Sequence, residues 1–369
     1  MKLQVLQENL AQALNIASRF ASNKAQLPVL ANIHLKTFKN KLLINATNLE
    51  VSVSVSAGAQ IKSEGEITTP ARAISEIIGN LAKKPVDLEV DKEQLKITTE
   101  NFSSTLAGIN AGDFPRVPVN VGKNAYQLPT EELIEALNKV LFSVSINESR
   151  PAITGVLFIF KPKQLTLVAT DGFRLSQKKI TIADPKEDFR VIIPKTVLTE
   201  LTRLSGEAEE ILFSYNKDEN QVIFGLPGVV VASRVIEGEF PPFEKIIPKE
   251  SVFSIETDRD ELLRAVKLSS VFARDSANVI KFNFKKKGIE ISAESKTTGT
   301  QKSFVDARIN GEITHEQAAF NFRFLEDILG VVESQAIEMS FAGENAPGVF
   351  CDSSDKNYLH IIMPVKIQY

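Results

Sequence analysis

Residues 32–48 read NIHLKTFKNKLLINATN, in which apolar and polar side chains alternate on both sides of a charged turn. Such alternation predicts two strands joined by a tight connection. The layout returns as GVLFIFKPKQLTLVATD at 155–171 and as IKFNFKKKGIEISAES at 280–295. The closing alanines Ala46, Ala169 and Ala293 lie 123 and 124 residues apart. A hairpin that returns at this nearly constant spacing indicates an internal repeat.

A strand and an amphipathic helix are expected before each hairpin, in Leu3–Phe20, Tyr126–Ser143 and Phe253–Ser270. The apolar positions of the three helices are Leu10, Ala13 and Leu14, then Leu133, Ala136 and Leu137, then Leu262, Ala265 and Val266. Spacings of three and four residues place each set on one helical face. A second helix is expected after each hairpin, at 70–81, 194–205 and 320–332, with Pro70 and Pro194 at helix starts.

Each repeat therefore predicts a two-layer α+β domain, in which two helices cover one sheet face. The first two repeats end alike, in Gly112-Asp113-Phe114-Pro115 and Gly238-Glu239-Phe240-Pro241. These ends predict three domains, at 1–120, 121–248 and 249–369. Three such domains can curve into an arc, and two arcs that meet head to tail can close a ring.

The composition excludes several classes of protein. The net charge of −3 argues against a protein that grips nucleic acid over its whole surface. One cysteine and three dispersed histidines predict neither a disulfide framework nor a metal site. The first residues lack the features of a signal peptide, and no stretch of 18 or more apolar residues suggests a membrane span. A cytoplasmic location is expected.

Residues that could carry catalysis are not evident, because the sequence lacks nucleotide-binding, nucleophile-elbow and zinc-protease motifs. Carboxylate pairs such as Glu131–Glu132 fall in the first turns of expected helices, where they favour the helix dipole. Asp258 and Glu261 have the spacing of a helix cap. Basic residues on the expected helices, among them Lys139 and Arg264, suit either solvated faces or a surface that contacts phosphates.

Together with the repeat, several motifs resemble the bacterial DNA polymerase III beta subunit, the sliding clamp family. They are Ala169-Thr170-Asp171-Gly172-Phe173-Arg174-Leu175, the two Gly-acid-Phe-Pro ends, His360-Ile361-Ile362-Met363-Pro364-Val365-Lys366, and Asn32 with Leu27-Pro28-Val29-Leu30. The resemblance implies a DNA-clamp fold and a head-to-tail homodimer whose six domains form a ring around duplex DNA. It implies a processivity factor without a cofactor or catalytic residues of its own.

The resemblance also implies partners and site residues. The partners are the DNA polymerase III alpha subunit, the clamp loader, and other polymerases and repair proteins with clamp-binding peptides; no membrane is involved. A peptide-binding pocket between the second and third domains would comprise Ile153, Thr170, Gly172, Phe173, Arg174, Leu175, Pro241, Lys245, Ile246, Asn321, Phe324, Ile361, Met363, Pro364 and Val365. DNA would contact Lys24, Arg72, Asn147, Arg150 and Lys195, and the subunit interface would contain Leu106, Val271 and Phe272.

Three positions depart from the family pattern, because Phe173 replaces a common His, and Lys245 and Lys366 replace Arg. A lysine keeps the charge of arginine but loses its planar, bidentate hydrogen bonding. Two other classes of function stay open at this point. A scaffold that binds proteins but not DNA would suit the acidic net charge, and an enzyme with an unrecognised site would have to turn over a substrate without partners.

Overall fold

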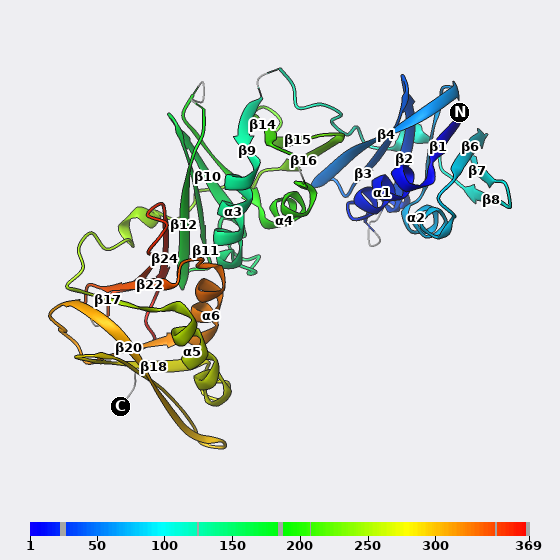
Figure 1. Ribbon diagram of the computed structural model, residues 1–369. Coiled ribbons are helices and arrows are strands. Elements are labelled where there is room, and N and C mark those ends of the chain that lie inside the picture. Colours follow the sequence, from blue (N-terminus) through cyan, green and yellow to red (C-terminus); the bar gives the residue numbers. More distant parts are fainter. Residues whose placement is uncertain (23–26, 124, 184–186, 207, 344, 367–369) are drawn as a thin grey trace. The chain divides into compact units, whose positions relative to one another are not determined.

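The computed structural model describes residues 1–22, 27–123, 125–183, 187–206, 208–343 and 345–366. The chain forms two compact units, the first of Met1–Thr130 with Arg203–Val235 and the second of Glu131–Thr202 with Ile236–Tyr369. Each unit contains one 12-stranded sheet (Figure 1). The middle repeat contributes strands to both sheets, so the units do not follow the three predicted domains, which stay a prediction.

The first unit carries helices α1 (Gln7–Ser18) and α2 (Ala71–Asn80). Its strands are β1 (Lys2–Leu6), β2 (Asn32–Phe38), β3 (Lys41–Thr47), β4 (Val51–Ser63), β5 (Glu66–Pro70), β6 (Pro85–Asp91), β7 (Gln94–Thr99), β8 (Phe102–Ala107), β9 (Tyr126–Pro129), β14 (Glu210–Asn216), β15 (Gln221–Leu226) and β16 (Val229–Arg234). They run in the order β8-β7-β6-β1-β4-β16-β15-β14-β9, while β3 extends from β4 through β2 to β5.

The second unit carries α5 (Arg259–Ala273) and α6 (Phe322–Val331), and nearly all of α3 (Thr130–Val140) and α4 (Lys195–Leu204). Its strands are β10 (Gly155–Lys161), β11 (Gln164–Thr170), β12 (Arg174–Thr181), β13 (Phe189–Pro194), β17 (Phe253–Asp258), β18 (Val279–Lys285), β19 (Gly288–Ser295), β20 (Gly299–Gly311), β21 (Gln317–Asn321), β22 (Ala336–Phe341), β23 (Gly348–Asp352) and β24 (Tyr358–Ile362). Their order is β13-β10-β11-β12-β24-β23-β22-β17-β20-β19-β18-β21.

The short 3-10 helices are η1 (Pro28–Ala31) and η2 (Ala111–Asp113) in the first unit, and η3 (Leu141–Ser143), η4 (Pro151–Ile153) and η5 (Phe243–Lys245) in the second.

The three predicted hairpins are confirmed as β2–β3, β10–β11 and β18–β19. In every repeat a third strand, β4, β12 or β20, continues from the hairpin, and a fourth, β5, β13 or β21, returns to its first strand. Each repeat then ends in three successive antiparallel strands, β6–β7–β8, β14–β15–β16 and β22–β23–β24. The repeat predicted from sequence spacing is thus a repeat of strand pairing.

Neighbouring repeats are joined by strand pairing. β16, the last strand of the second repeat, pairs with β4 from Val229↔Val55 to Ser233↔Val51. β24, the last strand of the third repeat, pairs with β12 from Tyr358↔Lys178 to Ile362↔Arg174. Among the described residues, β8 pairs along its length only with β7, and the first half of β20 only with β19. The described part of the chain therefore contains two joints of one design. It leaves one last strand, β8, and the first half of one third strand, β20, each with an unpaired edge.

The helices cover the sheets as the apolar spacing predicts. Leu10 and Leu14 of α1 are buried, and so are Leu262 and Val266 of α5. Helix α1 packs beside α2 and against β4, while α5 packs beside α6 and against β19 and β20. Burial of one leucine side chain contributes about 1.5–3 kcal/mol. The two-layer arrangement is confirmed in both units.

Helix starts agree with the sequence in part. Asp258 caps α5, since its Oδ1 accepts a hydrogen bond from the Glu261 amide at 2.9 Å. Pro70 and Pro194 end strands β5 and β13 and stand directly before α2 and α4. They precede the first helical residue rather than occupy it, because each still closes a strand pair with Asn32 or Gly155.

Candidate protein-binding surface

The turn between β11 and β12 is held by its own side chains. Asp171 Oδ1 accepts hydrogen bonds from the amides of Phe173 (2.9 Å) and Arg174 (3.0 Å). Thr170 Oγ1 accepts from the Gly172 amide and donates to the Arg174 carbonyl at 2.6 Å. Gly172 has a φ of 93°, which favours glycine. The turn leaves the Phe173 side chain 64% exposed.

Arg174 fastens this turn to the rest of the second unit. Its Nε donates to Asp171 (3.0 Å), its Nη2 donates to the Phe142 carbonyl (2.7 Å), and its Nη1 pairs with Asp327 of α6. The guanidinium also lies over the Phe324 ring, 4.4 Å from its centroid. A planar cation that has both charged partners and aromatic faces is strongly fixed in orientation. Arg174 therefore acts as a support rather than as an exposed charge.

The C-terminal segment runs beside the same turn. After β24, the Met363 amide donates to the Phe173 carbonyl at 2.9 Å, and the Val365 amide donates to the Ala319 carbonyl of β21 at 2.8 Å. These bonds hold the backbone of 363–365 and leave the side chains of Met363 and Val365 exposed.

A third segment contributes through η5. Phe243 is buried in one cluster with Leu175 and Ile361, and Ile246, three residues further on, is exposed. The segments that carry Phe173, Ile246, Met363 and Val365 are therefore joined by hydrogen bonds or by a common core. We call these four exposed apolar side chains the apolar surface. Exposed apolar groups of this kind are typical of sites that bind other proteins.

The predicted pocket residues differ in exposure. Ile153, Thr170, Leu175 and Ile361 are buried, and Leu175 and Ile361 share one core cluster with Phe243. Pro241 and Lys245 are exposed, while Pro364, Asn321 and Phe324 are partly buried. Asn321 caps α6, accepting a hydrogen bond from the Arg323 amide at 3.0 Å.

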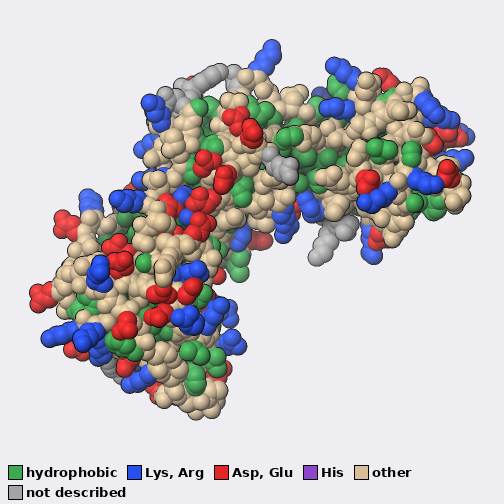
Figure 2. Space-filling view, in the orientation of Figure 1, with side chains coloured by type: hydrophobic (Ala, Val, Ile, Leu, Met, Phe, Trp, Pro, Cys, Tyr) green, Lys and Arg blue, Asp and Glu red, His purple; other side chains and the backbone are tan. Residues whose placement is uncertain are grey.

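The predicted DNA-binding residues are not gathered in one unit. Lys24 lies outside the described residues. Arg72 is exposed on α2 of the first unit, where its Nε donates to Glu76 at 2.8 Å. Asn147 in the second unit shapes a loop, because its Oδ1 accepts from the Ser149 amide. Figure 2 shows one face of the molecule, on which Lys and Arg side chains lie among Asp and Glu side chains.

Two of the predicted DNA-binding residues lie beside the Gly172 turn. Arg150 Nη1 is 3.6 Å from the position that a Cβ at Gly172 would take. Burial lowers the pKa of Lys195, and the nearby Arg174 guanidinium lowers it further against the opposing effect of Asp327. The structure therefore brings Arg150 close to the turn that presents Phe173, and places Lys195 within electrostatic reach of Arg174.

The predicted interface residues lie at edges. Leu106 is partly buried on the edge strand β8. Val271 is exposed near the end of α5, whereas Phe272 is partly buried against the core of the third repeat.

Sequence reasoning missed a group of buried charges. Lys139, placed on a solvated or phosphate-contacting face, is buried and pairs with Glu135 (2.7 Å) and Asp355 (2.9 Å). Lys178 of β12 is buried beside the same two carboxylates, Glu135 (3.1 Å) and Asp355. Asp355 is 216 residues from Lys139, so the sequence held no signal for this contact.

No group of three or more His, Cys, Asp or Glu side chains suited to a metal ion occurs among the described residues. In the same part of the chain, no helix has the length and apolar character needed to cross a membrane.

The fold and this surface define a repeat-built protein with paired sheet edges and an exposed apolar surface. Models of the N-terminal, central and C-terminal domains of the DNA polymerase III beta subunit match residues 1–118, 127–242 and 244–366. The chain belongs to this family, the sliding clamps that act as processivity factors in DNA replication.

Individual relatives agree over their full length. A beta sliding clamp of Synechocystis sp. is 29% identical, with 100% of both chains covered, and one of Staphylococcus aureus is 27% identical, with 99% of both covered. The crystal structure of a DNA polymerase sliding clamp from Bacillus subtilis has a TM-score of 0.94 at 27% identity, and covers 100% of both chains. A DNA polymerase III subunit beta from Pseudomonas aeruginosa, at 22% identity and a TM-score of 0.94 over 100% of both chains, shares the fold.

Proposed function

We propose that two copies of this chain close a ring around duplex DNA and keep a replicative polymerase on its template. The observation that carries this proposal is the pair of matching edges. The last strand of a repeat joins the third strand of the repeat before it twice within the chain. The third such joint needs β8 and β20, which are an unused last strand and an unused third strand. A head-to-tail dimer uses both and closes.

The internal joints also give the register of the contact between copies. The alanines that close the three hairpins define equivalent positions in the third strands. Ala46 pairs with Val53, Ala169 with Ser176 and Ala293 with Gln301. Val53 pairs with Val231 and Ser176 with His360, each the third residue of a last strand. Gln301 should therefore face Ser104 of β8 in the second copy, and Gly299 should face Leu106. Val271 corresponds to Phe142, whose ring lies 5.3 Å from that of His360, so Val271 should lie against the second copy's β8.

The apolar surface is proposed to bind short peptides of the DNA polymerase III alpha subunit, the clamp loader and other clamp-binding proteins. Phe173, Ile246, Met363 and Val365 offer apolar contacts, and Arg150 and Lys195 offer charge for a polar or acidic flank. The chain is proposed to have no catalytic activity of its own and to work in the cytoplasm, where replication takes place.

The ring is tested by topology. Clamp loaded on closed circular DNA by a clamp loader should stay bound, and should be released when the DNA is cut once, because a ring slides off an end. Equal retention on the circular and cut DNA would exclude the ring. A scaffold that does not bind DNA would keep its function when Lys24 and Arg72 are changed to Glu, whereas a clamp would lose DNA contact or loading.

The peptide surface is tested separately. Phe173→Ala and Met363→Ala should weaken binding of a polymerase-tail peptide at least tenfold, measured by calorimetry, since both side chains are exposed and available for contact. Phe38→Ala, a change at an exposed phenylalanine of the first unit, is the matched control and should leave the affinity unchanged. Unchanged affinity in both test variants would refute this surface.

A further inference from the structure

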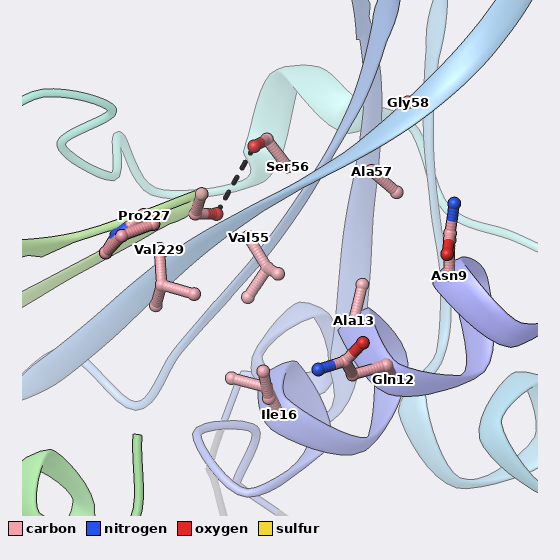
Figure 3. A pocket seen from close by; sticks show the side chains of 11 residues that line it. Asn9, Gln12, Ala13, Ile16, Val55, Ser56, Ala57, Gly58, Pro227 and Val229 are labelled. Atoms are coloured by element: carbon pink, nitrogen blue, oxygen red, sulfur yellow. Dashed lines mark hydrogen bonds between the residues drawn. The ribbon is translucent and has the colours of Figure 1, made fainter. Parts of the chain in front are cut away.

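The first internal joint places a turn of one repeat against the first helix of the repeat before it. The β15–β16 turn, Pro227–Gly228, and Val229 face Gln12 and Ile16 of α1 across a hollow of about 240 Å³ (Figure 3). Ser56 Oγ of β4 donates a hydrogen bond to the Gly228 carbonyl at 3.3 Å. All the residues that line this hollow are uncharged.

The second internal joint has the same strand pairing, but charged side chains meet where the first joint has uncharged ones. Asp355, in the β23–β24 turn, reaches Lys139 of α3 and Lys178 of β12, and Glu135 of α3 completes a group of four charges. The ammonium of Lys139 also lies 5.6 Å from the centroid of the Tyr358 ring, at the start of β24. This joint is therefore specified by opposite charges on the turn and on the helix.

The corresponding residues beside the unpaired edge of β20 are found by aligning the first helix of each repeat on Leu10, Leu133 and Leu262. Arg264 takes the place of Gln12 and Glu135, and Leu268 takes the place of Ile16 and Lys139. In the first repeat, the turn that corresponds to Pro227–Gly228 is Glu100–Asn101, and the first residue of the last strand is Phe102. The counterparts thus carry opposite charges, Arg264 on the helix and Glu100 on the turn.

We propose that Arg264 and Leu268 on α5 bind Glu100 and Phe102 of a second copy of this chain, an ion pair and an apolar contact that specify the joint between subunits. This proposal rests on the proposed ring. The groups are accessible within one chain, where the side chains of Arg264 and Glu100 are 67% and 71% exposed and Leu268 is 57% exposed. Leu268 can therefore contact Phe102 while the neighbouring Arg264 pairs with Glu100.

Each partner of this pair has an exposed charged neighbour within its own chain. Within the chain, Arg264 is 4.0 Å from Glu261, beyond hydrogen-bond distance, and Glu100 pairs with the exposed Lys84. Exposed pairs of this kind contribute little to stability. In the dimer the Arg264–Glu100 pair is partly removed from water and strengthens, because screening by solvent falls.

The test is a charge exchange between two variants. Glu100→Lys alone and Arg264→Glu alone should each raise the dissociation constant of the dimer about tenfold or more, since like charges meet at both interfaces. A mixture of the two variants should form heterodimers with the affinity of the wild type, because opposite charges then meet at both interfaces. Analytical ultracentrifugation and native mass spectrometry measure both quantities. Heterodimer formation also shows that each variant is folded.

Matched controls separate this pair from general charge effects. Glu93→Lys, at the other end of β7, and Arg323→Glu, at the start of α6, should leave the dimer unchanged, and so should Lys84→Ala. Leu268→Asp should dissociate the dimer without loss of folded structure. A dimeric wild type whose Glu100→Lys and Arg264→Glu variants dimerise equally well would overturn the pair and leave the ring intact. A wild type that stays monomeric at all concentrations would instead overturn the ring, and the pair with it.

Discussion

The guanidinium of Arg174 lies over the ring of Phe324, 4.4 Å from its centroid, and so links the turn before β12 to helix α6. The same group pairs with Asp171 in its own turn and with Asp327 on α6. This one side chain, of which only 10% is exposed, therefore fixes the backbone that presents Phe173.

Replacement of Arg174 by Ala should lower the free energy of unfolding of the second unit by about 2–4 kcal/mol, because two carboxylates lose their cation. Peptide affinity should fall as well, since the Phe173 turn loses its anchor. Arg174→Lys keeps the charge but not the forked geometry, so it should recover part of the stability and less of the peptide affinity. Urea unfolding and calorimetry measure the two effects, and an Arg174→Ala protein that binds peptide normally would contradict this role.

The buried charges at the second joint give a sharper stability prediction. Asp355→Ala leaves Lys139 and Lys178 with Glu135 as their shared carboxylate, and should destabilise the second unit by about 3–5 kcal/mol. Simultaneous replacement of all four charges, by Met at both lysines and Leu at both acids, should restore most of the loss, because no buried charge is left unpaired. Thermal unfolding tests both proteins; equal destabilisation by the single and fourfold changes would show that packing, and not charge, sets the cost.

Hairpins and helices were predictable from the sequence because their signals are local. Alternation at residues 32–48 and helical spacing at Leu10 and Leu14 are direct consequences of the geometry of one element. The pairing of β12 with β24 was not predictable in this way, since nothing in either strand specifies a partner so distant in the chain. For the same reason the sequence of α3 predicts only a solvated or phosphate-contacting face for Lys139, and not its buried ion pairs.

The candidate site was predictable to a similar extent. The Asp171-Gly172 turn has a local signal, and it does present an exposed Phe173. Which apolar residues face outward was not available from the sequence, because Leu175 and Ile361 lie only two residues from the exposed Phe173 and Met363 and yet belong to the core. The support by Arg174 depends on Asp327, a contact between residues 153 positions apart.

Stability should fall as the pH drops below about 6.5. Burial, and to a lesser degree Arg174, lowers the pKa of His360 from 6.5 to about 3, so between these values the unfolded chain binds a proton that the folded chain does not. Folding is then opposed by up to about 1.4 kcal/mol for each unit of pH. Above pH 6.5 the neutral His360 causes no loss of folding stability, and as the pH falls from 6.5 toward 3 the free energy of unfolding decreases progressively.

Unfolding midpoints at pH 7 and pH 5 test this linkage. His360→Gln should reduce the difference between the two values, even if it lowers both, because the new side chain does not titrate. His34 in the first unit also has a pKa lowered, chiefly by burial, so the variant His34→Gln should act on the first unit in the same direction. An undiminished difference in the doubly substituted protein would assign the pH dependence to other groups.

Gly172→Ala should separate backbone strain from side-chain contact. A Cβ at this position has space, with its nearest neighbour, Arg150 Nη1, at 3.6 Å, but the φ of 93° is unfavourable for alanine. The change should therefore destabilise the turn by about 1–3 kcal/mol. Because the turn orients Phe173, peptide affinity should fall by more than the small loss of overall stability explains. Gly79→Ala, on α2 with open space around its Cβ, serves as control and should be neutral or slightly stabilising. If Gly172→Ala binds a polymerase-tail peptide as tightly as the wild type, the left-handed turn is not needed to present Phe173.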